Sequence, residues 1–201
     1  MTDSLLDHLV YATPDLLATV DRFAEATGIR PVEGGRHEAW GTRNYLVGLG
    51  GTTYLEFIGP DPEASEVSLF DVSREQLLTW AIHPTDLESA LAAARAAGAD
   101  LGEIFPGSRT TPAGELLSWR VTGANPRPYE GVVPFLIDWA DSPHPALSLP
   151  VAELVDFQGT HPQPAEVQTI LQALGAELTV VEGPPALAAS VRGPAGTFHL
   201  S

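Results

Sequence analysis

The sequence contains no cysteine, which excludes disulfide bonds, thiolate nucleophiles and zinc sites built on thiolates. It has no run of about eighteen apolar residues, so no membrane-spanning helix is expected. Residues 1–4 carry no basic region, and no small-residue cleavage site follows an apolar stretch, so no secretory signal is predicted. These absences favour a cytoplasmic protein.

Positive charge is also scarce. Ten basic residues face 26 acidic ones, for a formal net charge of −16. Such a field repels phosphate backbones and anionic lipid, so we expect neither nucleic acid nor a membrane surface as a partner. The acidic residues are scattered along the chain, which is typical of a solvated surface.

The most regular feature that is present is a repeated order of strand, helix, strand, strand and strand. The chain has 201 residues, enough for one large domain or two small ones. Apolar periodicity with Pro and Gly boundaries predicts the pattern three times. In the first copy we predict a strand over 5–12, a helix from Leu16 to Gly28, and strands near 29–33, 44–49 and 53–58, separated by Gly34-Gly35 and Gly50-Gly51. In the second we predict a strand over 77–82, a helix from Leu87 to Gly98, and strands near 100–104, 115–122 and 132–139. In the third we predict a strand over 153–158, a helix over 164–174, and strands near 177–182, 186–192 and 196–200.

A repeat of this length is a supersecondary unit that cannot bury its apolar face alone. We therefore predict an α+β fold of βαβββ modules that form curved half-barrel sheets around a cleft. Two modules, about 1–62 and 76–140, pair within 1–145, and 146–201 forms a third βαβββ-like C-terminal unit.

The third unit has no module to pair with inside the chain, which favours a homodimer. The apolar stripe of its helix has to pack somewhere, and its members are Val167, Ile170, Leu171 and Leu174. The alternative is that the unit folds back onto the first two modules of the same chain.

Two strand-like apolar runs each contain one potential metal ligand: His8 within 5–11 and Glu56 within 54–58. A buried histidine or carboxylate is costly unless it is paired, hydrogen-bonded or bound to metal. His8 and Glu56 therefore indicate either a metal site or a His–Glu hydrogen bond inside a barrel. A divalent ion such as Zn, Ni, Fe or Mn would suit them, and two ligands do not choose among these metals.

The chain resembles the vicinal oxygen chelate superfamily, which includes glyoxalases and bleomycin-resistance proteins, and within it the glyoxalase-like domain family. The matching segments are Leu6-Asp7-His8-Leu9-Val10, Thr13-Pro14-Asp15-Leu16, Gly34-Gly35-Arg36-His37, Gly41-Thr42-Arg43-Asn44, Tyr54-Leu55-Glu56, Arg109, Gly114, Ser118-Trp119-Arg120, Pro134-Phe135-Leu136-Ile137-Asp138-Trp139 and His144-Pro145. The resemblance implies paired βαβββ modules, with metal ligands on the first and last strands of each. His8 and Glu56 match the first pair of ligand positions, whereas Thr79 and Ile137 stand at the second pair.

Other polar residues are candidates for the same cleft. His37, in a Gly-rich stretch that could fold over the cleft, is a candidate third ligand or general base, or a loop histidine without a special role. Asn44 could bind a substrate carbonyl and Arg43 a carboxylate, or both could belong to a turn.

Aromatic and basic side chains complete the predicted site. Trp119 is a candidate pocket wall, and core packing is the favoured explanation for at least two of the four tryptophans. Arg109 is a candidate anion-binding residue, and a surface ion pair is the alternative for Arg109 or Arg120.

Two functions follow. The first is a metal-dependent lyase, isomerase or dioxygenase in which Glu56 and His37 take part in catalysis, the metal binds two neighbouring oxygens, and Asn44, Arg43, Trp119 and Arg109 bind the substrate. The second is a metal-free protein that binds or sequesters a small organic molecule.

Overall fold

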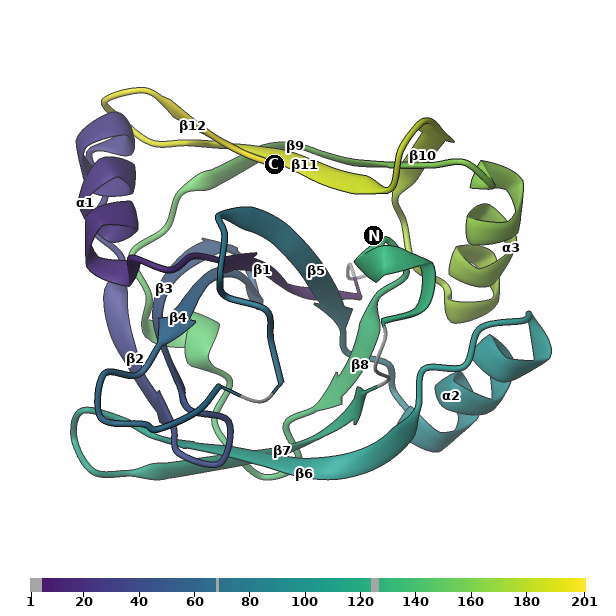
Figure 1. The fold of residues 1–201 in the computed structure, drawn as a ribbon, viewed down its shortest axis with the longest axis horizontal. Coiled ribbons are helices and arrows are strands. Elements are labelled where there is room, and N and C mark those ends of the chain that lie inside the picture. Colours follow the sequence, from purple (N-terminus) through teal and green to yellow (C-terminus); the bar gives the residue numbers. More distant parts are fainter. Residues whose placement is uncertain (1–4, 68, 124–126) are drawn as a thin grey trace.

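The computed structural model describes residues 5–67, 69–123 and 127–201. In these residues eight strands close into a barrel, and four more form a separate sheet that lies across it (Figure 1). The predicted α+β fold is confirmed.

The barrel consists of two halves with the same element order and the same strand order. The first half comprises β1 (Leu6–Ala12), α1 (Leu16–Thr27), β2 (Val32–His37), β3 (Thr42–Gly50) and β4 (Thr53–Pro60). The second comprises β5 (Gln76–Ile82), α2 (Leu87–Ala96), β6 (Glu103–Thr110), β7 (Leu116–Gly123) and β8 (Phe135–Asp138). In each half the first and last strands pair in parallel, as β1 does with β4 and β5 with β8. The pairs β1–β5 and β2–β6 join the halves and close the barrel.

The helix boundaries follow from residues visible in the sequence. Asp15 and Asp86 cap α1 and α2 by accepting hydrogen bonds from the backbone N–H groups of Ala18 and Ser89. Gly28 ends α1 in the left-handed conformation, with φ 75°.

The strand β2 differs from its prediction. Gly34 and Gly35 were expected to separate two strands, but both lie inside β2, where a bulge falls between Glu33 and Gly35. Glycine is needed at Gly35 because φ is 139° and a side chain would collide with the carbonyl oxygen of Thr110 on β6. The strand therefore extends to His37, which the sequence placed in a loop.

The C-terminal sheet has the predicted elements in a different strand order. They are β9 (Glu153–His161), α3 (Pro164–Leu174), β10 (Thr179–Glu182), β11 (Ala186–Arg192) and β12 (Thr197–Leu200). Two short 3₁₀ helices, η1 (Pro128–Gly131) and η2 (Pro145–Ser148), lie earlier in the chain, before and after β8. The sheet runs β10-β9-β11-β12, so its first strand is central, whereas β1 and β5 each lie at one end of their half. The third unit is therefore no third copy of the half-barrel.

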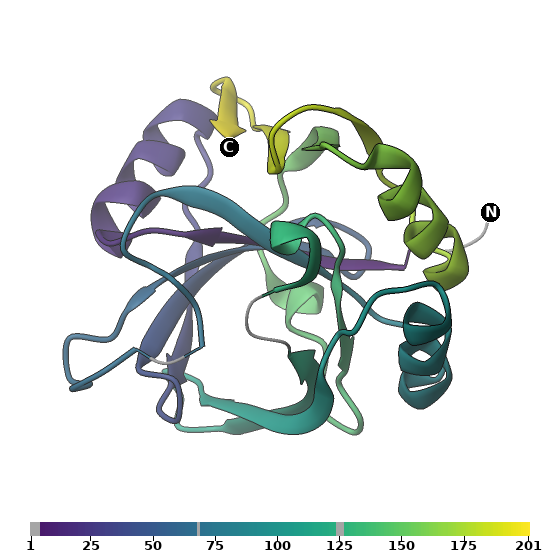
Figure 2. The same ribbon diagram turned by 45° about the vertical axis from the view of Figure 1, so that its right-hand side comes forward.

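The C-terminal sheet packs onto the barrel of the same chain, which is the fold-back arrangement. Phe157 of β9 packs edge-to-face on Trp80 of β5, with ring centroids 5.3 Å apart. The α3 stripe of Val167, Ile170, Leu171 and Leu174 is buried within the chain, and α3 lies beside α2 (Figure 2). The apolar face that suggested a dimer is thus already covered.

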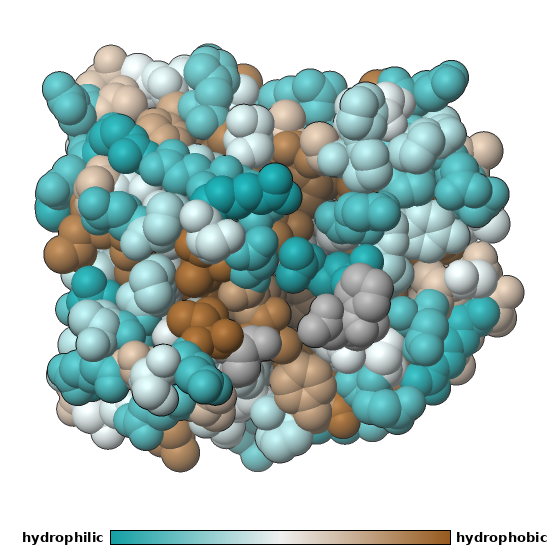
Figure 3. Space-filling view, viewed as in Figure 1, coloured by the Kyte–Doolittle hydropathy of each residue, from teal (hydrophilic) through white to brown (hydrophobic). Residues whose placement is uncertain are grey.

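Strand alternation divides each barrel strand between two environments. On β4, Leu55 and Phe57 join the main core beneath the helices and the C-terminal sheet, whereas Tyr54 and Glu56 turn into the barrel. The face shown in Figure 3 is mostly hydrophilic, with hydrophobic side chains visible near its middle. Among the described residues, no helix is long and apolar enough to span a membrane.

Candidate functional site

A pocket inside the barrel contains most of the predicted site residues. The empty space that it spans, its opening to solvent included, is about 840 Å³. The predicted residues in its lining are His8, His37, Asn44, Glu56, Arg109 and Trp119.

Arg43 is not in this lining. Alternation along β3 turns Asn44 into the barrel and its neighbour Arg43 to the other face, near Asp61. The structure therefore separates Arg43 from the other predicted residues.

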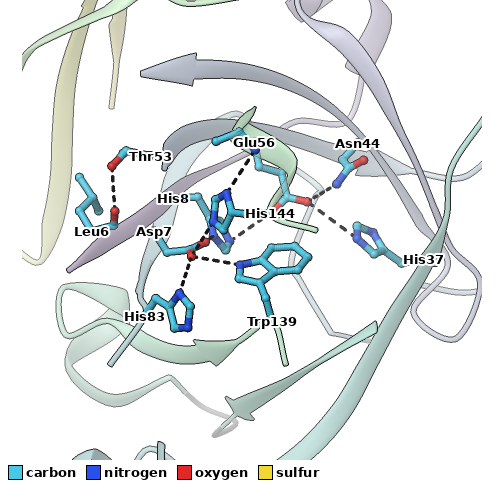
Figure 4. Close-up of polar contacts among 11 residues, drawn as sticks. Leu6, Asp7, His8, His37, Asn44, Thr53, Glu56, His83, Trp139 and His144 are labelled. Carbon is cyan, nitrogen blue, oxygen red and sulfur yellow. Dashed lines mark hydrogen bonds and ion pairs between the residues drawn. The ribbon is translucent and has the colours of Figure 1, made fainter. Parts of the chain in front are cut away.

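Glu56 is the centre of the polar end of the pocket. Its side chain is buried, with the residue 6% exposed. Nε2 of His8 lies 3.8 Å from Oε2, and Nε2 of His37 lies 3.9 Å from Oε1 (Figure 4). Asn44 donates a hydrogen bond from Nδ2 to Oε1 at 2.6 Å. One carboxylate thus faces two imidazoles across gaps that are longer than a hydrogen bond.

Arg109 of β6 extends this cluster. It is 4% exposed and donates a hydrogen bond from Nη1 to Oδ1 of Asn44 at 3.2 Å. Burial lowers the pKa of Arg109, while nearby Tyr54 and Glu56 raise it; a guanidinium remains charged in any case. The absence of a side chain at Gly34 makes room for this pair, because a Cβ there would collide with Arg109 and Asn44.

His37 is uncharged near neutral pH. Burial lowers its pKa to about 4, although the Glu56 carboxylate opposes the shift. Nδ1 lies 3.1 Å from Oγ1 of Thr42, which leaves Nε2 directed toward Glu56 and the pocket. His37 can therefore donate or accept a hydrogen bond at Nε2 inside the pocket without bringing a charge to it.

A bulge in β1 between Leu6 and His8 lets two consecutive residues meet. Nδ1 of His8 lies 2.6 Å from Oδ1 of Asp7, so the ring donates to the carboxylate and turns Nε2 toward Glu56. Asp7 also accepts hydrogen bonds from Nε1 of Trp139 at 3.1 Å and Nε2 of His144 at 3.0 Å. Burial alone would raise the pKa of Asp7, but the hydrogen bonds from His144 and His8 lower it well below its usual range.

The rest of the pocket is mainly aromatic and aliphatic. Trp40 stacks on His37 with ring centroids 5.1 Å apart and meets Trp119, which in turn packs on Trp139 at 5.2 Å. The fourth tryptophan, Trp80, is a core residue whose Nε1 donates to the carbonyl oxygen of Val132. Three of the four tryptophans thus line the pocket, and core packing accounts for one.

The donor set does not fit a metal ion held by protein side chains alone. The second half of the barrel offers Thr79 and Ile137 to the pocket, and Thr79 donates to the carbonyl oxygen of Gly131. Across the described part of the chain, no group of three or more His, Asp or Glu residues is arranged to hold a metal. The Arg109 guanidinium also brings a positive charge to the cluster, which opposes a divalent cation.

Several residues of this site are not predicted by the sequence analysis. Asp7 precedes His8 in the same apolar run, and a charged residue in such a run was a usable signal. His144 and Trp139 come from a segment distant in sequence, and Arg127 also lines the pocket. Trp139 and His144 stand in segments that carry the family resemblance, but no local pattern assigns them or Arg127 a role in the site.

Comparison with known proteins agrees with this architecture. The model of the glyoxalase-like domain family matches residues 6–175, so the chain belongs to that family, which is part of the vicinal oxygen chelate superfamily. The resemblance seen in the sequence is confirmed. No curated protein matches the chain.

One solved structure shows the same fold at low sequence identity, and two further matches have lower TM-scores. A hypothetical protein from Staphylococcus aureus is 14% identical, with a TM-score of 0.60, and the match covers 96% of this chain and 84% of that one. A variant of Streptomyces coelicolor methylmalonyl-CoA epimerase in complex with 2-nitronate-propionyl-CoA is 23% identical, with a TM-score of 0.47 over 67% of this chain and 96% of that one. A triple mutant of Streptomyces coelicolor 4-hydroxymandelate synthase is 13% identical, with a TM-score of 0.49 over 98% and 62%.

Proposed function

We propose that this protein is an enzyme that binds a small organic molecule in the barrel pocket and transfers a proton at a carbon next to a carbonyl group, as an isomerase or lyase does. The observation that carries the proposal is the position of Glu56. It is a buried carboxylate at the end of an apolar pocket, flanked by two imidazoles, with a buried guanidinium on the far side of Asn44.

The proposed step assigns one role to each side chain. Glu56 takes the proton from the substrate carbon, and the electron pair of the C–H bond becomes the C=C bond of an enolate. The enolate oxygen faces Arg109, whose charge stabilises it in an environment from which water is largely excluded. Uncharged His37 binds the substrate next to Glu56 through a hydrogen bond, and the protonated Glu56 returns its proton to the enolate at the new position.

His8 and Asn44 orient the carboxylate. Asp7 fixes the ring of His8, which limits the rotation of Glu56 on one side. On the other side the amide of Asn44 links Glu56 to Arg109. Trp119 and the other aromatic walls bind the apolar part of the substrate.

In this proposal Arg109 supplies the positive charge that a metal would otherwise bring. A divalent ion on His8 and Glu56 is the competing view, and it would need further ligands from the substrate or solvent. Elemental analysis of protein purified without chelator separates the two views.

Deuterium exchange tests the proposal without knowledge of the natural substrate. Aryl and branched 2-oxo acids, such as phenylpyruvate and 4-methyl-2-oxopentanoate, are incubated with the protein in D₂O, and loss of the proton next to the carbonyl is followed by NMR. We expect exchange above the protein-free rate, reduced about a hundred- to ten-thousand-fold in Glu56→Gln. The exposed Glu115→Gln is the matched control and keeps the wild-type rate.

A second candidate function, binding or sequestration without catalysis, is favoured by the aromatic and aliphatic side chains in the lining of the pocket. It predicts saturable binding of the same acids with no exchange above background. Equal exchange in the wild type and in Glu56→Gln would also refute the proposed step.

A further inference from the structure

Two arginines line the pocket without a carboxylate partner. All ten basic residues of the chain are arginine. Six of them form ion pairs with Asp or Glu: Arg22, Arg30, Arg36, Arg95, Arg120 and Arg192. Arg109 and Arg127 both line the pocket, and neither forms an ion pair with any carboxylate in the described residues.

These two arginines come from segments near opposite ends of β6. Arg109 lies near the end of β6, where it pairs with Leu117. Arg127 follows soon after Gly123, which pairs with Glu103 at the other end of β6. Six residues of strand separate Arg109 from Glu103, about 20 Å of backbone. Arg109 and the strand end that precedes Arg127 therefore lie about one strand length apart, and both arginines line the same pocket.

Arg127 is incompletely satisfied. Its Nε is buried and has no hydrogen-bond partner among the described residues. Burial lowers its pKa, which the charge of Asp71 partly opposes. A buried donor without a partner is destabilising. Nε of Arg43 is also buried without a partner, but of the two arginines it is Arg127 that lines the pocket, where a ligand can supply the acceptor.

The lining of the pocket is less acidic than the chain as a whole. Among the described residues, Arg109, Arg127 and one carboxylate, Glu56, line it, with Asp7 behind His8, while the chain carries a formal net charge of −16. Between the arginines the walls are formed mainly by Trp, Phe, Leu and Val side chains. An acidic protein that keeps two unpaired cations in an apolar pocket is built for an anion with an apolar middle.

We propose that the ligand is an elongated organic diacid with an apolar middle, one acidic group bound at Arg109 and the other at Arg127. The inference rests on the proposed function, because the Arg109 end is the reactive end. It adds a second anchor that selects against molecules with a single acidic group.

Calorimetric titration with a matched series of probes tests the proposal. The probes are saturated α,ω-dicarboxylates of increasing chain length and the monomethyl ester of each, which keeps the length and removes one charge. At the best length we expect the diacid to bind at least about ten-fold more tightly than its ester. In Arg127→Gln that advantage disappears, while the affinity for the ester stays within about two-fold of wild type.

Two further variants complete the design. Arg95→Gln removes an exposed, ion-paired arginine outside the pocket and keeps the full preference for the diacid. Arg109→Gln weakens binding of diacid and ester alike, and unchanged near-ultraviolet circular dichroism establishes that the variant is folded.

The diacid proposal is overturned if no chain length shows a preference for the diacid, or if Arg127→Gln keeps the preference. Ester binding that depends on Arg109 but gains nothing from a second charge would overturn only the second anchor, and the proposed reactive end would stand. If neither diacid nor ester binds, the inference fails, and the deuterium-exchange experiment decides the proposed function separately.

Discussion

At the scale of single residues, the central feature of the site is the buried carboxylate of Glu56, which has few hydrogen-bond partners. Among the described residues, Glu56 has one side-chain hydrogen-bond donor, Asn44, and two imidazoles beyond hydrogen-bond distance, His8 and His37. A buried carboxylate with unfilled acceptor capacity is costly in a resting protein and useful in one that has to accept a proton. The same contrast applies to Arg109, whose only side-chain partner in the described residues is an amide.

The depressed pKa of His37 makes a stability prediction with a definite sign. The pKa falls from 6.5 to about 4 on folding, so the unfolded chain binds the proton first as the pH drops. The free energy of unfolding should therefore decrease between pH 6.5 and about 4, by roughly 3 kcal/mol, and then level off with respect to this group. Urea unfolding at a series of pH values measures it.

His37→Gln should flatten the pH dependence of unfolding in that window. His199→Gln, which removes an exposed histidine, should leave it unchanged. Folding also lowers the pKa of Asp7. The stability that Asp7 contributes is lost only below its ordinary pKa of 3.8, which is outside the pH window of His37. A His37→Gln profile that coincides with wild type would show that His37 is not held uncharged.

Gly34 provides a second prediction at this scale. Gly34→Ala introduces a Cβ that displaces Arg109 and Asn44, so binding of a monocarboxylate should weaken about ten-fold. Gly48→Ala is the control, because a Cβ at Gly48 makes only ordinary contacts, the nearest at 3.4 Å. Isothermal calorimetry compares the two, and equal affinities would mean that the Arg109–Asn44 pair does not bind the acid.

At the scale of secondary-structure elements, the sequence predicts most of the fold because helix and strand signals are local. Asp15, Asp86 and Gly28 mark helix ends with their own side chains or backbone conformation. The strand β2 was misjudged because Gly34 and Gly35 are ordinary turn residues, and their reason for being glycine lies on β3 and β6. That contact is invisible to a pattern read along one segment.

The site divides in the same way. His8 and Glu56 could be predicted because each interrupts an apolar strand, and strand alternation then brings them to one side. Asp7 meets His8 only because β1 bulges, and His144 comes from a segment more than a hundred residues away. The sequence analysis predicts both Asn44 and Arg43 as substrate-binding residues. Strand alternation sends neighbouring side chains to opposite faces, so Asn44 lines the pocket and Arg43 does not.

The helix α3 supports a stability prediction for the whole C-terminal unit. Leu171 is fully buried in the main core, so Leu171→Ala should lower the free energy of unfolding by about 2–5 kcal/mol. Leu147→Ala, at a position 73% exposed, should change it by less than about 0.5 kcal/mol. Chemical denaturation of both variants checks this, and similar losses would mean that α3 does not pack as described.

At the scale of the whole molecule, the C-terminal sheet packs on the barrel of its own chain, whereas the sequence favoured packing against a second copy. It lies on β5 and α1 through Trp80–Phe157 and Phe23–Phe198 contacts, and the N–H of Leu77 donates to the carbonyl oxygen of Ser201. The C-terminal sheet thus covers one side of the barrel, and residues of a single chain line the pocket.

This packing leads us to expect a monomer in solution. Light scattering at micromolar concentration should give a mass near that of one chain, 21.3 kDa. A mass of twice that value would restore the homodimer predicted from the sequence and would require an interface on another face.

The central claim is that Arg109, and no metal ion, supplies the positive charge that stabilises the enolate in the pocket. The most direct test measures deuterium exchange and metal content in the same preparation, purified without chelator. We predict exchange with far less than one transition-metal ion per chain, undiminished by dialysis against a chelator and lost in Arg109→Gln. Exchange that rises and falls with bound Zn, Ni, Fe or Mn, and that survives in Arg109→Gln, would contradict the account.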